Sequence, residues 1–209
     1  IYQLFPNSPR TEFGDLILRT SGNDWSNTLF RDNLMQGLIK NEADLDIQHY
    51  RHCSVFINGA YFGIHILTEK QDADYADFHQ KISSDSLDYI ENNGEIKEGD
   101  ATAYQQMVGL LTAGVPSNAA FQALDAVCDT KNFTDYIISE IFTANTSWGH
   151  NIALFRKRSP TGKWRWFPHD YDRGFDLGNV NGTAMEWATS TNGQDWSNPA
   201  WGTLFLRKM

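Results

Sequence analysis

The chain has 209 residues, of which 41% are hydrophobic and 13% aromatic, and this composition is typical of a folded globular protein. Its net charge of −9 excludes a general nucleic-acid-binding surface, because phosphate binding requires a basic stripe and the sequence has none. No apolar run is long enough to span a bilayer. The chain begins at Ile1 without a signal peptide and stops inside an apolar pattern, so we expect a fragment of a longer protein.

The first third of the chain predicts a strand, a helix and a β-hairpin. Apolar residues alternate over 15–19, which predicts a short strand. A helix is expected over 27–40, where an asparagine precedes an apolar stripe. The dipeptide Asn58-Gly59 supplies the positive φ angles of a type I′ turn, so strands over 51–57 and 61–68 are predicted to pair.

The middle of the chain predicts mainly helices. An acidic first turn, which the helix dipole favours, marks a helix over 72–81. Residues 83–99 contain few large apolar groups, so we expect an exposed excursion with at most one short strand near 87–90. N-cap residues and apolar stripes predict three further helices, over 101–111, 118–128 and 133–143. Strands followed by helices and a second hairpin indicate an α+β fold rather than an alternating parallel sheet.

The most informative stretch runs from a polar turn over 145–151 to a closely spaced pair of carboxylates. Two alternating strands, 152–157 and 163–167, separate the two features and would bring Asn151 and Asp170 to the same end of a hairpin. An amide oxygen and carboxylates form a hard-oxygen site that suits Mg²⁺. Protein kinases present their two metal ligands in the same order along the chain, so the pattern makes phosphoryl transfer a hypothesis to test. Beyond Gly174 the sequence has no defensible period, and we expect a loop.

Six short segments lie in register along most of residues 15–176. They are Leu18–Trp25, Phe30–Asp32, Val55–Gly63, Thr68–Lys70, His150–Phe155 and Lys163–Asp172. In sequence and order, these segments resemble the CotH family of atypical kinase-like proteins, first known from bacterial spore coats. The resemblance implies a kinase-like fold in which antiparallel hairpins pack with a helical subdomain. It also implies a β/α lobe over 1–70 and, over 71–209, a helical subdomain with the metal-site hairpin.

The resemblance also implies chemistry at particular positions. It implies Mg²⁺ and ATP as cofactors, with phosphoryl transfer to a protein or another hydroxyl acceptor. Asp170 and Asn151 match the two metal-binding positions of the family, and Asp172 is expected to be a second ligand or to orient the first. Glu69 and Arg31 match polar positions that recur in the family, and we assign them to cofactor binding.

Three departures from the family pattern concern catalysis. Thr146 stands where the family has its catalytic aspartate, five residues before the metal-binding asparagine, so His150 becomes the candidate base. His169 stands where a tryptophan usually precedes the metal-binding aspartate. The basic residue that would hold the phosphates is expected upstream of Ile1. The alternative function is therefore a weakened or inactive kinase-like binding or structural protein, with carbohydrate among its candidate ligands.

Other interpretations of the same residues stay open from the sequence. Asp170 and Asp172 could cap turns, pair with neighbouring arginines or form an Asp-x-Asp metal site of the glycosyltransferase kind. Tryptophans concentrated in the last quarter fit core packing or a sugar-stacking platform. Cys53 and Cys128 are too few to define a disulfide framework and are expected to be two small buried hydrophobes. An extracytoplasmic or cell-surface location is slightly favoured, whereas the oligomeric state stays open.

Overall fold

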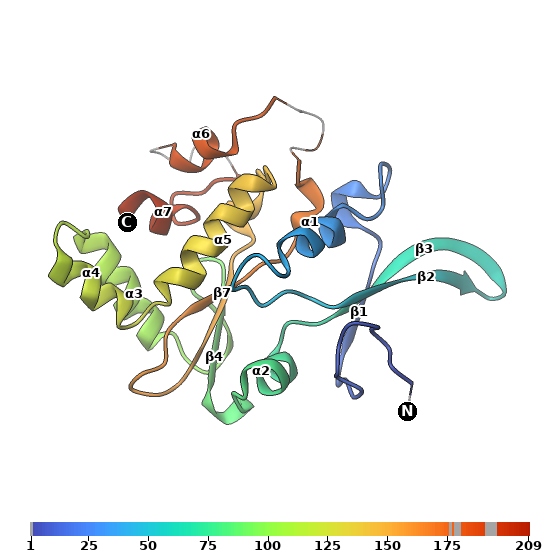
Figure 1. Ribbon diagram of the computed structural model, residues 1–209, viewed down its shortest axis with the longest axis horizontal. Coiled ribbons are helices and arrows are strands. Elements are labelled where there is room, and N and C mark those ends of the chain that lie inside the picture. Colours follow the sequence, from blue (N-terminus) through green and yellow to red (C-terminus); the bar gives the residue numbers. More distant parts are fainter. Residues whose placement is uncertain (1, 176, 178–180, 191–195) are drawn as a thin grey trace.

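Two antiparallel sheets and the helices around them organise the chain, in a computed structural model that describes residues 2–175, 177, 181–190 and 196–209 (Figure 1). The predicted α+β class is confirmed. The first sheet has the order β1-β3-β2 and consists of β1 (Leu16–Arg19), β2 (Tyr50–Ile57) and β3 (Ala60–Glu69). The second sheet has the order β5-β4-β6-β7 and consists of β4 (Leu87–Glu91), β5 (Glu95–Glu98), β6 (Ala153–Lys157) and β7 (Arg165–Phe167). The helices are α1 (Arg31–Ile39), α2 (Ala73–Gln80), α3 (Thr102–Ala113), α4 (Asn118–Asp125), α5 (Thr130–Phe142), α6 (Ala184–Thr189) and α7 (Leu204–Lys208).

The hairpin of β2 and β3 dominates the first sheet and extends away from the rest of the molecule (Figure 1). Asn58 and Gly59 have φ angles of 52° and 83°, as a type I′ turn requires, and Ile57 pairs with Ala60 across the turn. The predicted hairpin is therefore confirmed. Several of its large apolar side chains are exposed, because the described residues place no helix over the tip of the hairpin.

Helix α1 begins at Arg31, four residues later than the sequence predicted. The cause is the buried carboxylate of Asp24, which accepts hydrogen bonds from the Thr28 N–H (3.1 Å), the Thr28 hydroxyl (2.5 Å) and the Arg31 N–H (3.1 Å). These bonds wrap residues 24–31 around one side chain, so the backbone adopts turns before the helix starts. Helix α1 then packs through Met35 against Tyr171.

Strand β4 corrects the prediction of an exposed excursion over 83–99. Leu87 and Ile90 are both fully buried, and β4 is a central strand that pairs with β5 on one side and β6 on the other. The apolar signal is weak because the buried Asp88 lies among these residues, and its carboxylate pairs with Arg156 at 3.1 Å and Arg158 at 2.8 Å. The short strand expected near 87–90 is therefore present as β4 but is buried, whereas the edge strand β5 is exposed along its length, as predicted for this segment.

The second sheet has a hydrophobic core on each face. On one face, Tyr75 of α2 packs edge-on against Phe167 with ring centroids 5.5 Å apart. On the other face, Phe133 of α5 lies 4.8 Å from Trp166. Side chains alternate along each strand, so β6 and β7 contribute to both cores. Both cysteines are free thiols; Cys128 is buried in the larger core, as expected, whereas Cys53 is only partly buried.

The C-terminal region contains two short helices, α6 and α7, where the sequence predicted only loop. Their six and five residues are too few to show a helical period. Phe205 of α7 packs against Trp166 with ring centroids 5.0 Å apart, so this region closes one side of the core. The rest of the predicted loop falls partly on residues 176, 178–180 and 191–195, which lie outside the described residues.

Among the described residues, no helix combines the length and apolar character needed to cross a membrane.

Candidate metal and nucleotide site

The hairpin of β6 and β7 brings Asn151 and Asp170 together. Ala153 pairs with Phe167, so the residues just before β6 and just after β7 lie at the same end of the sheet. The Asn151 side-chain amide donates a hydrogen bond of 2.7 Å to Oδ2 of Asp170. A rotation of this amide about its last torsion would present its oxygen instead of its nitrogen to a cation. The two residues predicted to share a metal ion are therefore neighbours.

Asp170 adopts an unusual backbone conformation. Its φ and ψ angles are 59° and 47°, in the left-handed region that non-glycine residues seldom occupy. A 3₁₀ turn over Tyr171–Arg173 follows at once, and its first N–H, from Tyr171, donates to Asp32 Oδ1 at 3.1 Å. The fully buried Tyr171 ring anchors this turn through a 2.8 Å hydrogen bond between its hydroxyl and Ser139. Surrounding contacts thus hold Asp170 in a strained conformation, as is common at functional sites.

One guanidinium connects the two sheets at this point. Arg19, at the end of β1, contacts Asp32 of α1 at 2.8 Å, Asp172 at 3.1 Å and also Asp170. Burial acts to lower the pKa of Arg19, but the three carboxylates outweigh it and raise this pKa above its usual range. The carboxylates carry one negative charge each and the guanidinium one positive charge. This group of four described residues therefore keeps a formal charge of −2.

Asp172 is the most buried of the aspartates that face Asp170. Its Oδ2 accepts a 2.7 Å hydrogen bond from the backbone N–H of Asn23, and the Asn23 side-chain amide lies 3.2 Å from Oδ1. Burial raises the pKa of Asp172, the charge of Asp170 adds to this rise, and the Asn23 and Arg19 contacts offset part of it. Burial and mutual repulsion therefore make the negative charges of this site energetically unfavourable, and a bound cation would reduce that electrostatic cost.

Behind the hairpin, a buried network fixes the turn that carries Asn151. Asn145 donates from its amide to Glu140 Oε2 at 3.0 Å and to the Asp170 carbonyl at 3.4 Å. Its amide oxygen accepts from the Ser147 hydroxyl at 3.0 Å. Burial raises the pKa of Glu140 well above its usual value, which favours the neutral form of this carboxyl group. Within the polar turn over 145–151, Asn145 and Ser147 therefore have a structural role, which is to position Asn151.

A cavity of about 430 Å³ lies between the two sheets beside Arg19. This volume falls in the usual range for small-molecule sites, about 300–1,000 Å³. Its lining combines the cations Arg19, Lys70 and Lys97 with the carboxylates Asp72, Glu91 and Glu98, and the side chains of Gln48, Gln71 and His169 add further polar groups. The His169 Nδ1 is buried without a hydrogen-bond partner among the described residues. The cavity therefore offers charges of both signs to a polar ligand.

The structure does not bring Glu69 and Arg31 to the same part of the site. Glu69 is fully buried at the end of β3, where it pairs with Arg10 at 2.8 Å and with two histidines. Arg31 donates to Asp24 at 3.2 Å and to the Gly174 carbonyl at 2.7 Å, so it supports the loop next to the 3₁₀ turn over 171–173. Their assignment to cofactor binding stays a prediction, and both side chains have structural partners.

The candidate catalytic residues Thr146 and His150 lie on the turn before β6 and are partly buried. His150 Nδ1 lies 3.2 Å from the Ser197 carbonyl oxygen. A carbonyl only accepts, so Nδ1 carries the proton in the neutral ring and Nε2 keeps a free lone pair. Trp196, which is 71% exposed, contacts the same ring with centroids 4.9 Å apart. By contrast, Trp164 and Trp166 are buried core residues.

Arg19, Asn23 and Asp32 were not among the residues singled out from the sequence. All three lie inside the family-like segments Leu18–Trp25 and Phe30–Asp32, so their signal was present. The sequence could not show that these segments fold back onto Asp170, more than a hundred residues away along the chain.

The residues at the hairpin end fit a magnesium ion on the chemistry of their donor atoms. Asp170, Asp172 and Asn151 supply hard oxygens, which Mg²⁺ prefers, and it takes only one or two carboxylates from a protein when phosphate oxygens complete its shell. The formal charge of −2 on the Arg19 cluster equals the charge that a divalent cation would neutralise. Of the charged side chains that line the adjacent cavity, the cations suit the phosphates of a nucleotide and the three carboxylates do not.

The model of a protein family described as "CotH kinase protein" matches residues 2–209. The chain matches no curated protein.

Proposed function

The chain belongs to the CotH kinase family, and from this premise we propose that it binds ATP with Mg²⁺ and transfers a phosphoryl group to a hydroxyl acceptor. The acceptor is a protein side chain or a small molecule. The proposal rests on the proximity of Asn151, Asp170 and Asp172. The guanidinium of Arg19 beside them neutralises their negative charge only in part. Phosphoryl transfer depends mainly on such positioning and charge neutralisation.

Each group has a role in this proposal. Asp170 and Asn151 hold the cation, and Asp172 is a second ligand or orients Asp170. Arg19 and Lys70 face the phosphates from the cavity between the sheets, a role that the sequence assigned to a residue upstream of Ile1. When bound, Mg²⁺ supplies neutralisation of the charge that develops on the phosphate oxygens. The buried network of Glu140 and Asn145 keeps the ligand-bearing turn in place.

The acceptor oxygen forms a bond to the γ-phosphorus while the bond from that phosphorus to the β–γ bridging oxygen breaks, and ADP leaves. The acceptor's proton requires a base. Thr146 has no carboxylate to accept it, whereas His150 Nε2 has a free lone pair when its Nδ1–H faces the Ser197 carbonyl. His150 is therefore the base in this proposal, and activity is expected to be low in the absence of a carboxylate at position 146.

The test is transfer of labelled γ-phosphate, to the protein itself and to a panel of hydroxyl acceptors, with Mg²⁺ present. Thr146→Asp should raise the rate by about 10²–10⁴-fold, since a positioned general base has that effect. His150→Ala should abolish wild-type transfer but matter little in the Thr146→Asp background. Asp170→Asn is the control that should be inactive in both.

The alternative function is a kinase-like binding module that retains the fold and the cation site. The absence of a carboxylate at Thr146 favours it, and the exposed Trp196 beside His150 is the first place to look for a carbohydrate ligand. This alternative holds if Thr146→Asp binds ATP with Mg²⁺ but transfers no phosphate to any acceptor or to itself.

A further inference from the structure

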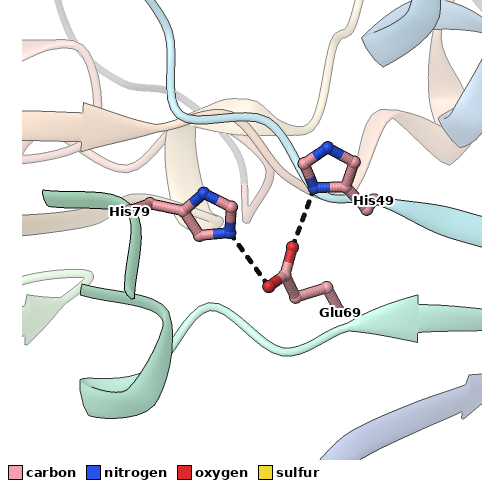
Figure 2. A group of neighbouring side chains, drawn as sticks. All are labelled: His49, Glu69 and His79. Atoms are coloured by element: carbon pink, nitrogen blue, oxygen red, sulfur yellow. Dashed lines mark hydrogen bonds and ion pairs between the residues drawn. The ribbon is translucent and has the colours of Figure 1, made fainter. Parts of the chain in front are cut away.

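A second polar cluster lies at the other end of β3 from the Asn58-Gly59 turn. Figure 2 shows that His49 and His79 each turn one ring nitrogen toward the carboxylate of Glu69, which lies between them. His49 Nδ1 is 2.9 Å from Oε2, and His79 Nε2 is 3.0 Å from Oε1. His49 immediately precedes β2, Glu69 ends β3, and His79 lies in α2. Three separate elements therefore converge on one buried carboxylate.

The protein alone already balances the charge of this carboxylate. Arg10 contacts Glu69 Oε1 at 2.8 Å, and its guanidinium lies over the rings of Phe13 and Phe78 at 4.7 and 5.5 Å. Burial acts to raise the pKa of Glu69, but hydrogen bonds from His49, His79 and Arg10 outweigh it and hold the pKa well below its usual range. Arg10 thus holds the Glu69 carboxylate in place between the two imidazoles, where its oxygens can serve as metal ligands.

The geometry of the three ligand atoms fits a four-coordinate ion. His49 Nδ1, a Glu69 oxygen and His79 Nε2 all lie within 4.8 Å of one another. Bonds of about 2.0–2.1 Å in a tetrahedron place ligand atoms roughly 3.3 Å apart. The side chains would therefore need to move by about 1 Å or less. Two histidines and a glutamate form a common zinc ligand set, and imidazole selects zinc and neighbouring transition metals over Mg²⁺.

The surroundings supply the other parts of a metal site. The side chains of His49 and His79 are 14% and 17% exposed, so a fourth ligand such as water can approach, and His49 also lines a cavity of about 320 Å³. Arg10 fixes the orientation of the Glu69 carboxylate from outside, as partners of metal ligands commonly do. Neutral imidazoles bind a metal after a change of tautomer, without net loss of a proton.

We propose that His49, Glu69 and His79 bind a borderline transition metal ion, with Zn²⁺ the best fit to the ligand set. The site would clamp the first sheet to α2, which packs through Tyr75 and Ala76 onto the second sheet. The inference does not depend on nucleotide binding or phosphoryl transfer, because it uses none of the residues around Asp170.

The test uses the full chain, stripped with a chelator and titrated with Co²⁺ as a spectroscopic probe. One equivalent should produce the intense visible absorption bands of tetrahedral cobalt, and Zn²⁺ should displace them. Separately, Zn²⁺ at a hundredfold excess over its Kd should raise the Tm by about 5–10 °C relative to the chelator-treated protein. Both measurements use the wild-type chain, so they stand even if a variant fails to fold.

Variants locate the site. His49→Gln and His79→Gln should each abolish the tetrahedral bands, whereas His52→Gln, on the exposed part of β2, should retain them. Asp170→Asn should also retain them, which separates this site from the magnesium site. The proposal would be overturned if the wild-type chain showed no tetrahedral bands and had the same Tm in Zn²⁺ and in chelator. The three side chains would then be only a hydrogen-bonded structural cluster. Bands that persist in both glutamine variants would overturn the proposal as well.

Discussion

The two carboxylate clusters of this protein differ in how completely the protein neutralises them. Around Asp170, one guanidinium serves three aspartates, and the side chains of Arg19 and Asp170 are 27% and 24% exposed. Around Glu69, one guanidinium serves one fully buried carboxylate, and two imidazoles complete its hydrogen bonds. The first cluster lacks positive charge, whereas the second is balanced.

This difference separates two kinds of binding capacity. A cluster short of positive charge and rich in oxygen attracts a hard divalent cation, and its partial exposure leaves room for phosphates. A balanced cluster gains little from more charge, but its imidazole nitrogens can coordinate a softer metal. Substitutions can therefore break one cluster at a time, and their effects should fall on different measurements.

The largest expected effect is the loss of stability in Glu69→Gln. The variant leaves Arg10 without its buried counter-ion, which should lower the free energy of unfolding by about 3–5 kcal/mol at pH 7. The lowered pKa of Glu69 means that its stabilisation is present above the unfolded-state pKa of about 4.3 and is lost as the pH falls through the folded-state value. Urea unfolding should therefore show a difference that shrinks below about pH 4.

The matched control is Glu42→Gln, an exposed loop carboxylate, which should stay within about 0.5 kcal/mol of the wild type. A Glu69→Gln protein as stable as this control would contradict the description of the buried cluster.

The variant Arg19→Gln tests whether the cluster around Asp170 is a cation-binding site or only a salt bridge. Loss of the guanidinium should reduce stability by roughly 2–3 kcal/mol without Mg²⁺, because hydrogen bonds between charged groups have about this value. Mg²⁺ should then restore more stability to the variant than it adds to the wild type, since the carboxylates have lost their cation. Thermal melts with and without Mg²⁺ measure both effects, with Arg51→Gln on β2 as the exposed control. An equal response to Mg²⁺ in variant and wild type would count against a cation site here.

The raised pKa of Asp172 predicts how cation affinity depends on pH. Protonation competes with the metal, so affinity should fall as the pH drops through the raised pKa, by up to about tenfold per unit. The fall should begin at a higher pH than for an ordinary aspartate, whose pKa is about 3.9. Mg²⁺ titrations across pH check this, and Asp172→Asn should flatten the profile. An unchanged profile in that variant would remove Asp172 from the site.

The smallest expected effect comes from Asn23→Ala. The variant loses the side-chain amide near Asp172 but keeps the backbone N–H that binds the same carboxylate at 2.7 Å. One hydrogen bond of this kind contributes about 0.5–1.5 kcal/mol, so Mg²⁺ affinity should fall by no more than about tenfold. The same Mg²⁺ titration, with Asn27→Ala as control, measures it. A loss as large as that expected for Asp170→Asn would show that Asn23 binds the cation directly.

The sequence predicted the elements with strong local signals and missed those that tertiary contacts define. Asn58-Gly59 determines its own turn, and the strands on either side of residues 158–162 brought Asn151 to Asp170 as predicted. Helices α6 and α7 are too short to show a period, and the burial of the short strand expected near 87–90, which is β4, depends on long-range packing. The Asp24 side chain makes α1 start later than predicted, because the hydrogen bonds that it accepts from the following loop are not described by helix propensities.

The candidate site was predictable in part for the same reason. Asn151 and Asp170 belong to one hairpin, so local strand geometry was enough to relate them. Arg19 and Asp32 reach the site from a different sheet and helix, and only the folded structure relates their charges to Asp170. His49, Glu69 and His79 come from three elements, and nothing in their spacing marks them as neighbours.

The most direct test of the central claim is a calorimetric titration of the protein with ATP, with and without Mg²⁺, in the wild type and in Asp170→Asn. The wild type should bind ATP in a manner that depends on Mg²⁺. The variant should bind at least about 30-fold more weakly, since loss of one partner from a partly buried charged contact commonly removes 2 kcal/mol or more. Its thermal stability should stay close to that of the wild type, because Asp170 lies at a polar strand end and not in the core. Equal ATP affinity in the two proteins, or binding unaffected by Mg²⁺, would contradict the account.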